Sequence, residues 1–432
     1  MIPFVLAAVP AVIALLLWSI VDLEKFVLFA VLGAMIVPAS LAKPGGANVA
    51  GVDVLLLVAL ASWLILNSIG RASDPWVKKN PLVKPALLFV AVSAASLAWS
   101  IKPRSTFVFT IQLIEITIMF PLVFATLPRS VANIRKAFVL LIALTSVMAL
   151  ATLAVYAAHP STHTQGTYLP GLNKNAIGTF VTAGAVLAYA LLIGSERTGP
   201  RALLALLLAL DVGGLVASGS RGATIGAGAA VLAVSFLLGR RRLLAVGVMA
   251  ALAVVYLAVI GPSAAKKADA SGGYDSSVVR QYAWEGAIKK IEQRPFFGTG
   301  GKTYTDTLPQ LDGFVTSDPL NLFLLTWAEL GIAGMAALIY LLCRFGQLLA
   351  RARRLPREAA VLAVGAGGVA ISLIAHFQFD VSWTRGTTSL EFAMMGLMVA
   401  LTRLSTPNGD LPAAEMLGAP VASEAPVSLE LV

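Results

Sequence analysis

Cysteine, histidine and charge are all scarce in this chain. Cys343, the only cysteine among 432 residues, lies inside an apolar run, which excludes an internal disulfide and a thiolate metal site. Only 12% of the residues are charged, whereas 58% are hydrophobic and the mean hydropathy is +0.84. A soluble domain must carry polar groups over its surface, so this composition predicts a membrane protein.

The few charged and titratable residues exclude two further kinds of site. No Asp/Glu cluster accompanies any of the three histidines, His159, His163 and His376, on one element, so we expect no metal cofactor. The formal net charge of +10 would suggest nucleic acid in a soluble protein. Here lysine and arginine occupy mainly short loops between hydrophobic runs, which indicates membrane topology and no nucleic-acid partner.

Long hydrophobic runs are what the chain has in abundance, and each can cross a hydrocarbon core of roughly 30 Å as a helix. We predict an all-α polytopic membrane protein with about 12 or 13 transmembrane helices. The predicted spans are residues 2–20, 26–42, 51–70, 83–99, 107–127, 135–158, 175–194, 202–219, 222–239, 243–262, 319–343, 358–376 and 386–403. The first run lacks a basic leader and a clear cleavage site, so we expect a retained helix.

Basic residues gather in alternate loops of this series. They lie at residues 71–84, 129–136, 197–201, 240–242 and 344–357. The positive-inside rule predicts that these loops are cytoplasmic. The long polar segment 263–318 is then external, together with the shorter loops 100–106, 159–174, 218–221 and 377–385.

The chain divides into four predicted regions. Transmembrane helices occupy residues 1–262 and 319–404, and the external loop 263–318 separates them. The tail at 405–432 is rich in Pro, Ala, Ser and Glu, so we expect it to be disordered in the cytoplasm. The chain has no repeat of fixed period and no matched Gly/Pro-broken helices, which would indicate an inverted-repeat transporter.

The external loop contains a predicted amphipathic helix over about residues 276–293. Arg280, Trp284, Ile288 and Ile291 share one helical face, which suits a helix at the outer membrane–water interface. Arg280 would then point toward lipid head groups or a diphosphate. A glycine turn follows at 294–301, and its backbone is expected to approach a ligand closely.

Three external motifs occur in order along the chain. They are Ser218-Gly219-Ser220-Arg221-Gly222; Arg280 and Trp284 with Pro295, Gly298 and Gly300; and Asp318-Pro319-Leu320-Asn321 followed, after nine residues, by Gly331-Ile332-Ala333-Gly334. In order, spacing and topology they resemble the signature of the O-antigen ligase/polymerase family of membrane glycosyltransferases. Trp99-Ser100 and Asn173-Lys174-Asn175 also look similar to that family.

The resemblance implies a lipid-sugar glycosyltransferase of the C-type fold in the inner membrane of a Gram-negative bacterium. The donor would be O-antigen polysaccharide on undecaprenyl diphosphate, and the ligase members transfer it to lipid A–core at the periplasmic face. Transfer would proceed with inversion and without a metal, among membrane lipids.

The same resemblance assigns roles to individual residues. Arg221 and Arg280 would bind and neutralise the diphosphate leaving group, and Trp284, Asn321, Gly298 and Gly300 would lie at the substrate. Taken alone, Arg221 also fits an arginine that snorkels to the interface, and Arg280 a solvated loop residue.

Leu320 departs from the family, whose third motif begins His-Asn. The histidine would accept a proton from the acceptor hydroxyl or position that hydroxyl, and leucine can do neither. Three explanations stay open: a variant in which the histidine is replaced, a divergent member that uses another base, and a misleading alignment. His376, with Asp380 one turn later, is the candidate substitute, although a buried structural histidine is the preferred interpretation; Asp318 is a further carboxylate nearby.

Glu115, Asp211, Glu329 and Glu391 lie in or near predicted spans. Isolated membrane carboxylates are functional candidates, and we favour helix–helix hydrogen bonds for these four. A proton relay would instead indicate a transporter. The sequence therefore predicts an O-antigen ligase, with an O-antigen polymerase, a protein O-oligosaccharyltransferase and a transporter as alternatives.

Overall fold

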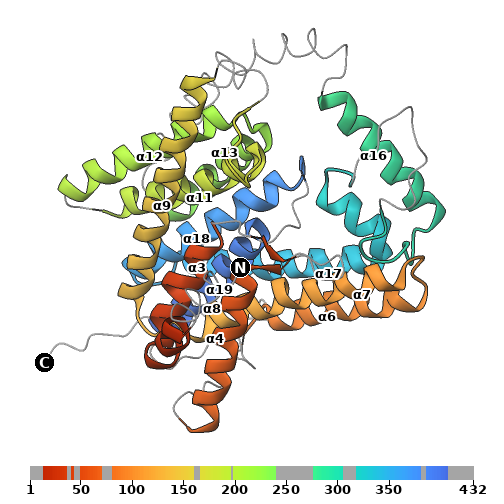
Figure 1. The fold of residues 1–432 in the computed structure, drawn as a ribbon, viewed down its shortest axis with the longest axis horizontal. Coiled ribbons are helices and arrows are strands. Elements are labelled where there is room, and N and C mark those ends of the chain that lie inside the picture. The colour runs from red at the N-terminus through yellow and green to blue at the C-terminus, as the bar shows by residue number, and fades with distance from the viewer. Residues whose placement is uncertain are drawn as a thin grey trace, which may run out of the picture.

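The computed structural model describes residues 13–36, 40–42, 49–70, 80–159, 166–195, 198–239, 276–304, 318–380 and 386–406. In chain order its helices are α2 (Leu23–Lys25), the π-helix η1 (Phe26–Val31), α3 (Leu32–Ala34), α4 (Gly51–Ser68), α6 (Val83–Ala95), the 3-10 helix η3 (Ser96–Ala98), α7 (Pro103–Ile114), the π-helix η4 (Glu115–Met119), α8 (Phe120–Thr126), α9 (Val131–Ala158), α11 (Lys174–Gly194), α12 (Thr198–Ser218), α13 (Arg221–Leu238), α16 (Ser276–Gln293), α17 (Leu322–Ala352), α18 (Arg357–His376) and α19 (Thr387–Ser405). Two short strands, β1 (Ser40–Ala42) and β2 (Val49–Ala50), pair antiparallel. The described chain is otherwise helical, as predicted (Figure 1).

Within the described residues, eight helical segments are long and apolar enough to cross a membrane. They are α4, α7 to α8 as one segment, α9, α11, α12, α13, α17 and α18, and each overlaps a predicted span. The multi-pass membrane class is therefore confirmed, while the count of about 12 stays a prediction. The predicted span 243–262, residues 2–12 of the first span, residues 407–432 of the tail, and residues 263–275 and 305–317 of the external loop lie outside the described residues.

The predicted span at 26–42 is wrong. Helix is present there only as α2, η1 and α3, from Leu23 to Ala34, and residues 40–42 belong to β1. Twelve helical residues rise about 18 Å, well short of a hydrocarbon core of roughly 30 Å. Pro38, which follows in the sequence, opposes continuation of the helix because its nitrogen has no hydrogen to donate.

The centre of the bundle consists of α11, α18 and α19, whose residues are buried on nearly every side. Glycines allow the neighbouring helices to come close. A Cβ added at Gly226 of α13 would lie 2.3 Å from the carbonyl oxygen of Ser372 in α18, and one at Gly368 would lie 2.6 Å from a methyl of Val234. Small residues at such interfaces stabilise membrane helices because they permit close van der Waals packing.

The basic loops contact one another at one end of this bundle. Arg135 lies 3.5 Å from Glu358, and Arg357 donates to the carbonyl oxygen of Gly194 at 3.5 Å. Arg403 donates to the carbonyl oxygen of Thr126 at 3.2 Å. These contacts join loops that the charge pattern assigns to one side, so the structure supports the predicted alternation without showing which compartment it faces.

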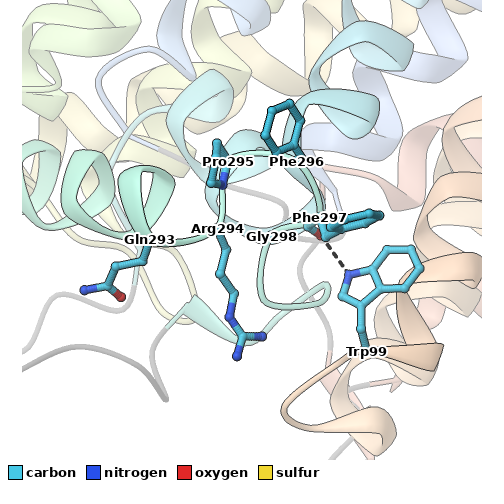
Figure 2. Close-up of a pocket in the computed structure, with 7 residues that line it drawn as sticks. All are labelled: Trp99, Gln293, Arg294, Pro295, Phe296, Phe297 and Gly298. Carbon is cyan, nitrogen blue, oxygen red and sulfur yellow. Dashed lines mark hydrogen bonds between the residues drawn. The ribbon is translucent and has the colours of Figure 1, made fainter.

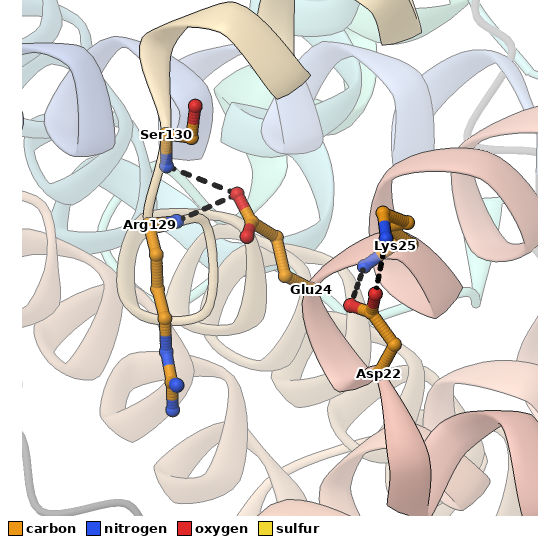
Figure 3. A network of polar contacts seen from close by, with 5 residues as sticks. All are labelled: Asp22, Glu24, Lys25, Arg129 and Ser130. Carbon is orange, nitrogen blue, oxygen red and sulfur yellow. Dashed lines mark hydrogen bonds and ion pairs between the residues drawn. The ribbon is translucent and has the colours of Figure 1, made fainter.

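A further polar network joins the N-terminal segment to this end (Figure 3). One oxygen of Glu24 accepts the backbone N–H groups of Arg129 at 2.9 Å and Ser130 at 3.0 Å. The neighbouring Asp22 pairs with Lys25 at 2.6 Å. Burial raises the pKa of Asp22, but the hydrogen bonds from Lys25 outweigh it, and the pKa is lowered overall. Glu24 thus satisfies free amides at the start of α9, and it holds α2 beside that helix.

Candidate functional site

The second and third sequence motifs meet at the C-terminal end of α18, at the end of the bundle away from the basic loops. The backbone N–H of Leu322 donates to the carbonyl oxygen of Phe377 at 2.9 Å. The side chain of Asn321 donates to the carbonyl oxygen of Gln378 at 3.3 Å. Arg280 of α16 donates its Nε hydrogen to the carbonyl oxygen of Phe379 at 3.0 Å. The second and third motifs thus both donate hydrogen bonds to the three consecutive carbonyl groups of residues 377–379.

The first motif reaches the same place through a chain of polar side chains. Ser220 caps α13, and its hydroxyl donates to the Oδ1 atom of Asn175 at 3.0 Å. The amide of Asn175 in turn donates a short hydrogen bond to Asp380. Arg221 is the first residue of α13 and is half-buried beside this network. The structure thus brings the Ser220 cap of the first motif, through Asn175, to the end of α18 that Arg280 also contacts.

Three helices begin at this site, and each begins at a polar cap. Asn173 caps α11, Ser220 caps α13 and Asn321 caps α17, each accepting a backbone N–H of the first turn. The N-terminal end of a helix carries partial positive charge because its amide dipoles align. Three such ends, together with Arg221 and Arg280, create an environment that favours an anion.

Asp380 is the carboxylate at the centre of this environment. It is half-buried, and burial raises its pKa, with a further rise from the negative charge of Asp318. The hydrogen bond from Asn175 and the charges of Arg280 and Lys174 act in the opposite direction. Asp380 therefore holds its proton at higher pH than an exposed aspartate, although the charges of Arg280 and Lys174 partly oppose this shift.

Leu320 has an unusual backbone conformation. Its φ of +51° falls in the left-handed region, which is rare for a residue with a branched side chain. Its N–H donates to the Oδ1 atom of Asp318 at 2.8 Å, and this bond holds the turn. Such strain is typical of functional sites, where the surrounding structure holds one side chain in a required direction.

Asn321 has a structural explanation for its place in the motif. Its Oδ1 atom accepts the N–H groups of Phe323 and Leu324, both at 3.0 Å, and its amide donates to Gln378. A cap of this kind stabilises a helix start by about 1 kcal/mol. The side chain predicted to contact substrate therefore also anchors α17 to the end of α18.

His376 is enclosed by protein, which agrees with the preferred interpretation of a buried structural histidine. It is only 2% exposed, and its Nδ1 atom forms a hydrogen bond of 2.9 Å with the hydroxyl of Thr179. A Cβ added at Gly222 would lie 2.5 Å from its ring. Asp380, one turn later, is the more exposed of the two titratable groups.

Helix α16 has the predicted extent, and it packs against α17 through small residues. Ala283 and Ala287 are buried, and Ala287 packs with Leu325 and Ala328 of α17. Trp284 is half-buried, whereas Ile288 of the predicted apolar stripe is 47% exposed. The alanines permit close contact with α17, and an interfacial position for the face of Arg280 and Ile288 stays a prediction.

The glycine turn after α16 approaches α17 closely. Gly298 has φ of +65°, and a Cβ there would lie 2.3 Å from the carbonyl oxygen of Glu329. Gly300 donates its N–H to that oxygen at 2.8 Å. Both glycines are thus required by contact with the protein itself, and a ligand contact remains a proposal for them.

The close approach is possible because α17 is broken at Gly331. Gly331 has φ of +67° and ψ of −167°, a conformation that residues with a Cβ essentially avoid. The break exposes backbone groups that the turn satisfies: Thr299 donates to the carbonyl oxygen of Ala328 at 3.2 Å, and Ile332 donates to that of Pro295 at 3.0 Å. The motif glycine therefore joins the second and third motifs into one unit.

The buried carboxylates in the helices follow the prediction only in part. The hydroxyl of Thr145 in α9 donates to Asp211 in α12 at 3.3 Å, which is the predicted helix–helix bond. Glu329 instead accepts the loop N–H groups of Lys302 at 2.8 Å and Tyr304 at 2.9 Å. The helix–helix prediction is wrong for Glu329, which shapes the turn; for Glu115 and Glu391 it stays a prediction.

Among the described residues, no group of three or more His, Cys, Asp or Glu is placed to hold a metal ion.

Comparison with known families agrees with the arrangement of the motifs. The model of the O-antigen ligase family matches residues 202–339, from within α12 to within α17. This range contains all three motifs, and the match confirms the predicted resemblance. It supports an O-antigen ligase/polymerase-type membrane enzyme. No curated protein matches the chain significantly.

Proposed function

We propose that this O-antigen ligase/polymerase-type membrane enzyme transfers O-antigen polysaccharide from undecaprenyl diphosphate to lipid A–core. Transfer would occur at the periplasmic face of a Gram-negative inner membrane, with inversion, without a metal, on a glycosyltransferase C-type fold. The observation that carries the proposal is the convergence of Arg280, Asn321 and the Ser220–Asn175 pair on residues 377–380.

The donor would place its diphosphate at the anionic site formed by Arg221, Arg280 and the starts of α11, α13 and α17. When the bond between the anomeric carbon and the diphosphate breaks, negative charge increases on the leaving group. Cations and helix amides that are already in place stabilise this charge without reorganisation. A guanidinium suits the role because its donors match the spacing of phosphate oxygens.

Asp380 would act as the proton acceptor in this chain. The acceptor hydroxyl forms the new bond to the anomeric carbon from the face opposite the diphosphate, which inverts the configuration. Its proton passes to the carboxylate of Asp380, while the bonding electrons of the donor leave with the diphosphate. At the end of α18, Asp380 combines a titratable group with partial exposure, whereas His376 is buried. The other nearby carboxylate, Asp318, accepts the N–H of Leu320.

Leu320 occupies the family's histidine position and offers no proton acceptor. Its strained turn, held by Asp318, is the conformation that would direct a histidine toward the residues at the end of α18. The chain would therefore use Asp380 with a slower reaction, which corresponds to the second explanation left open by the sequence.

Removal of either arginine tests the donor site. Arg280→Ala and Arg221→Ala should each lower transfer by about 10²- to 10³-fold, because each removes a preorganised cation. Capped lipopolysaccharide would be scored in ligase-deficient Gram-negative cells supplied with a matching donor and acceptor. Lys289→Ala, an exposed cation of the same helix, is the matched control and should transfer normally. Full transfer by both arginine variants would refute the assignment.

Introduction of the family histidine tests the acceptor side. Leu320→His should raise transfer in the same cells by roughly 10²-fold or more, since a positioned general base contributes about 10² to 10⁴. If Leu320→His and the unchanged chain transfer equally, the role given to position 320 is wrong. If neither caps lipopolysaccharide, the acceptor is wrong, and a polymerase or protein O-oligosaccharyltransferase, which would share the donor site, becomes preferred. Sugar transfer on one face, as opposed to solute flux across vesicles, excludes the transporter.

A further inference from the structure

A cavity of about 500 Å³ lies at the far end of α16 from Arg280. Trp99 and residues 293–298 line it. Figure 2 shows the rings of Phe297 and Trp99 on one side of the loop, and the side chains of Gln293 and Arg294 on the other. The lining is mostly apolar, and its aromatic members, Trp99, Phe296 and Phe297, are called the aromatic wall below; Gln293 and Arg294 are its polar members.

The aromatic wall is exposed yet held in place. Phe296 is 65% exposed and Phe297 is 62% exposed. The ring of Phe297 meets that of Trp99 edge to face at 5.3 Å, and the indole N–H of Trp99 donates to the carbonyl oxygen of Phe297 at 2.8 Å. The indole N–H of Trp327 donates to the carbonyl oxygen of Pro295 at 3.0 Å. Large apolar groups that are exposed and already ordered lose little entropy when a partner binds.

Positive charge surrounds this wall. Arg294 lines the cavity, and Lys102 and Arg104 are exposed on the neighbouring turn. That turn is joined to the loop through the Ile101 N–H, which donates to Thr299 at 3.2 Å, and the Thr106 hydroxyl, which donates to Gly301 at 2.9 Å. Among the residues that the structure describes, none that lines the cavity is acidic. Apolar rings beside cations fit an anionic amphiphile, whose phosphate pairs with arginine and whose hydrocarbon covers the rings.

The position of the cavity distinguishes between the two lipids of the proposed reaction. Arg280 and Arg294 lie near opposite ends of α16, about 20 Å apart at 1.5 Å of rise per residue. A donor whose diphosphate contacts Arg280 cannot also place that diphosphate at Arg294. An acceptor in which an oligosaccharide separates the lipid from the reacting hydroxyl bridges such a distance.

We propose that this cavity docks the acceptor lipid, a phosphorylated and acylated glycolipid. Its acyl chain would contact Phe296, Phe297 and Trp99, and its phosphate would pair with Arg294. The oligosaccharide would then extend along α16 and bring its terminal hydroxyl to Asp380. This inference rests on the proposed ligase function and names where that function holds its second substrate.

Binding to the purified full-length protein in nanodiscs tests the proposal independently of transfer. The probes are lipopolysaccharide that lacks O-antigen, the same molecule after deacylation, undecaprenyl diphosphate and phosphatidylglycerol. Arg294→Glu and Phe296→Ser should each weaken binding of the intact acceptor by about tenfold or more, as aromatic and arginine anchors commonly do. Arg353→Glu and Phe236→Ser make the same changes at exposed positions on other elements and should bind normally.

Undecaprenyl diphosphate should bind both cavity variants as well as it binds the unchanged protein, and deacylated acceptor should bind weakly to all. Unaltered acceptor binding by Arg294→Glu and Phe296→Ser would overturn the proposal while leaving the donor site intact. Equal competition by phosphatidylglycerol would also overturn it, because the cavity would then hold bulk membrane lipid. Loss of donor binding in Arg280→Ala, measured in parallel, reports on the proposed function alone.

Discussion

Asp380→Asn should reduce sugar transfer by about 10²- to 10⁴-fold, the contribution typical of a positioned general base. The amide keeps the shape of the side chain and still accepts the hydrogen bond from Asn175, but it cannot take up a proton. The measurement is capped lipopolysaccharide in ligase-deficient cells, followed by single-turnover transfer by the purified enzyme. Glu292→Gln makes the same chemical change at an exposed site of α16 and should leave transfer unaltered.

The same residue predicts a pH dependence. Burial and the charge of Asp318 raise the pKa of Asp380, so its carboxyl stays protonated at pH values where an exposed aspartate is ionised. Because a base must be ionised, transfer should rise with pH through this raised pKa and level off above it. Asp318→Asn removes one cause of the shift and should move the rise to lower pH, while its amide oxygen can still accept the N–H of Leu320.

Stability separates this role from a structural one. A raised pKa means that the folded state binds the proton more tightly than the unfolded state, so this stabilisation is present at low pH and is lost as pH rises. Asp380→Asn should therefore fold at least as well as the unchanged chain at neutral pH. Full transfer by Asp380→Asn, or a pH profile that Asp318→Asn does not shift, would exclude Asp380 as the base.

Gly331→Ala should cause the largest loss of folded protein. The φ of +67° and ψ of −167° at this position cost about 1–3 kcal/mol for a residue with a Cβ. In addition, the new methyl would lie 2.1 Å from the carbonyl oxygen of Phe296, where no flexible side chain can move aside. The expected result is a lower melting temperature in detergent, with release of the 294–301 turn from α17.

Gly346 provides the matched control on the same helix. It is exposed, and a Cβ there would meet nothing within 4 Å. Gly346→Ala should leave the melting temperature unchanged or raise it slightly, because alanine favours helix by up to about 1 kcal/mol. Equal melting temperatures for the two variants would show that the break in α17 does not hold the turn.

The membrane helices could be predicted from the sequence because the bilayer requires each segment that crosses it to be apolar and to form its own backbone hydrogen bonds. A long apolar segment can satisfy its backbone hydrogen bonds within itself, so span and extent follow from composition alone. Residues 174–194 and 357–376 illustrate this, since α11 and α18 differ from the predicted spans by a single residue at their starts. The 26–42 run failed because hydrophobicity alone does not show where a helix stops.

The sequence motifs also identified Arg280, Asn321 and Gly331, and each forms a specific contact or conformation in the structure. The sequence singled out Asp380 only as a neighbour of His376. We propose Asp380 as the proton acceptor in place of His376 because His376 is buried. The bond from Asn175 to Asp380 joins residues 205 positions apart, and no local pattern indicates such a pairing. The sharp turn at Leu320 likewise became visible only through its φ of +51°.

By itself, the sequence determined the membrane class, the helix positions in most of the described chain and the family resemblance. The first two depend on residues that are near one another in the chain, and the third depends on the order and spacing of short motifs. The tertiary structure decided which side chains share the site, which glycines contact α17 rather than face an opening, and which face of α16 is buried. Those properties depend on close contacts between distant segments. A contact of that kind is specified by the packing of the whole bundle and by no single stretch of the chain.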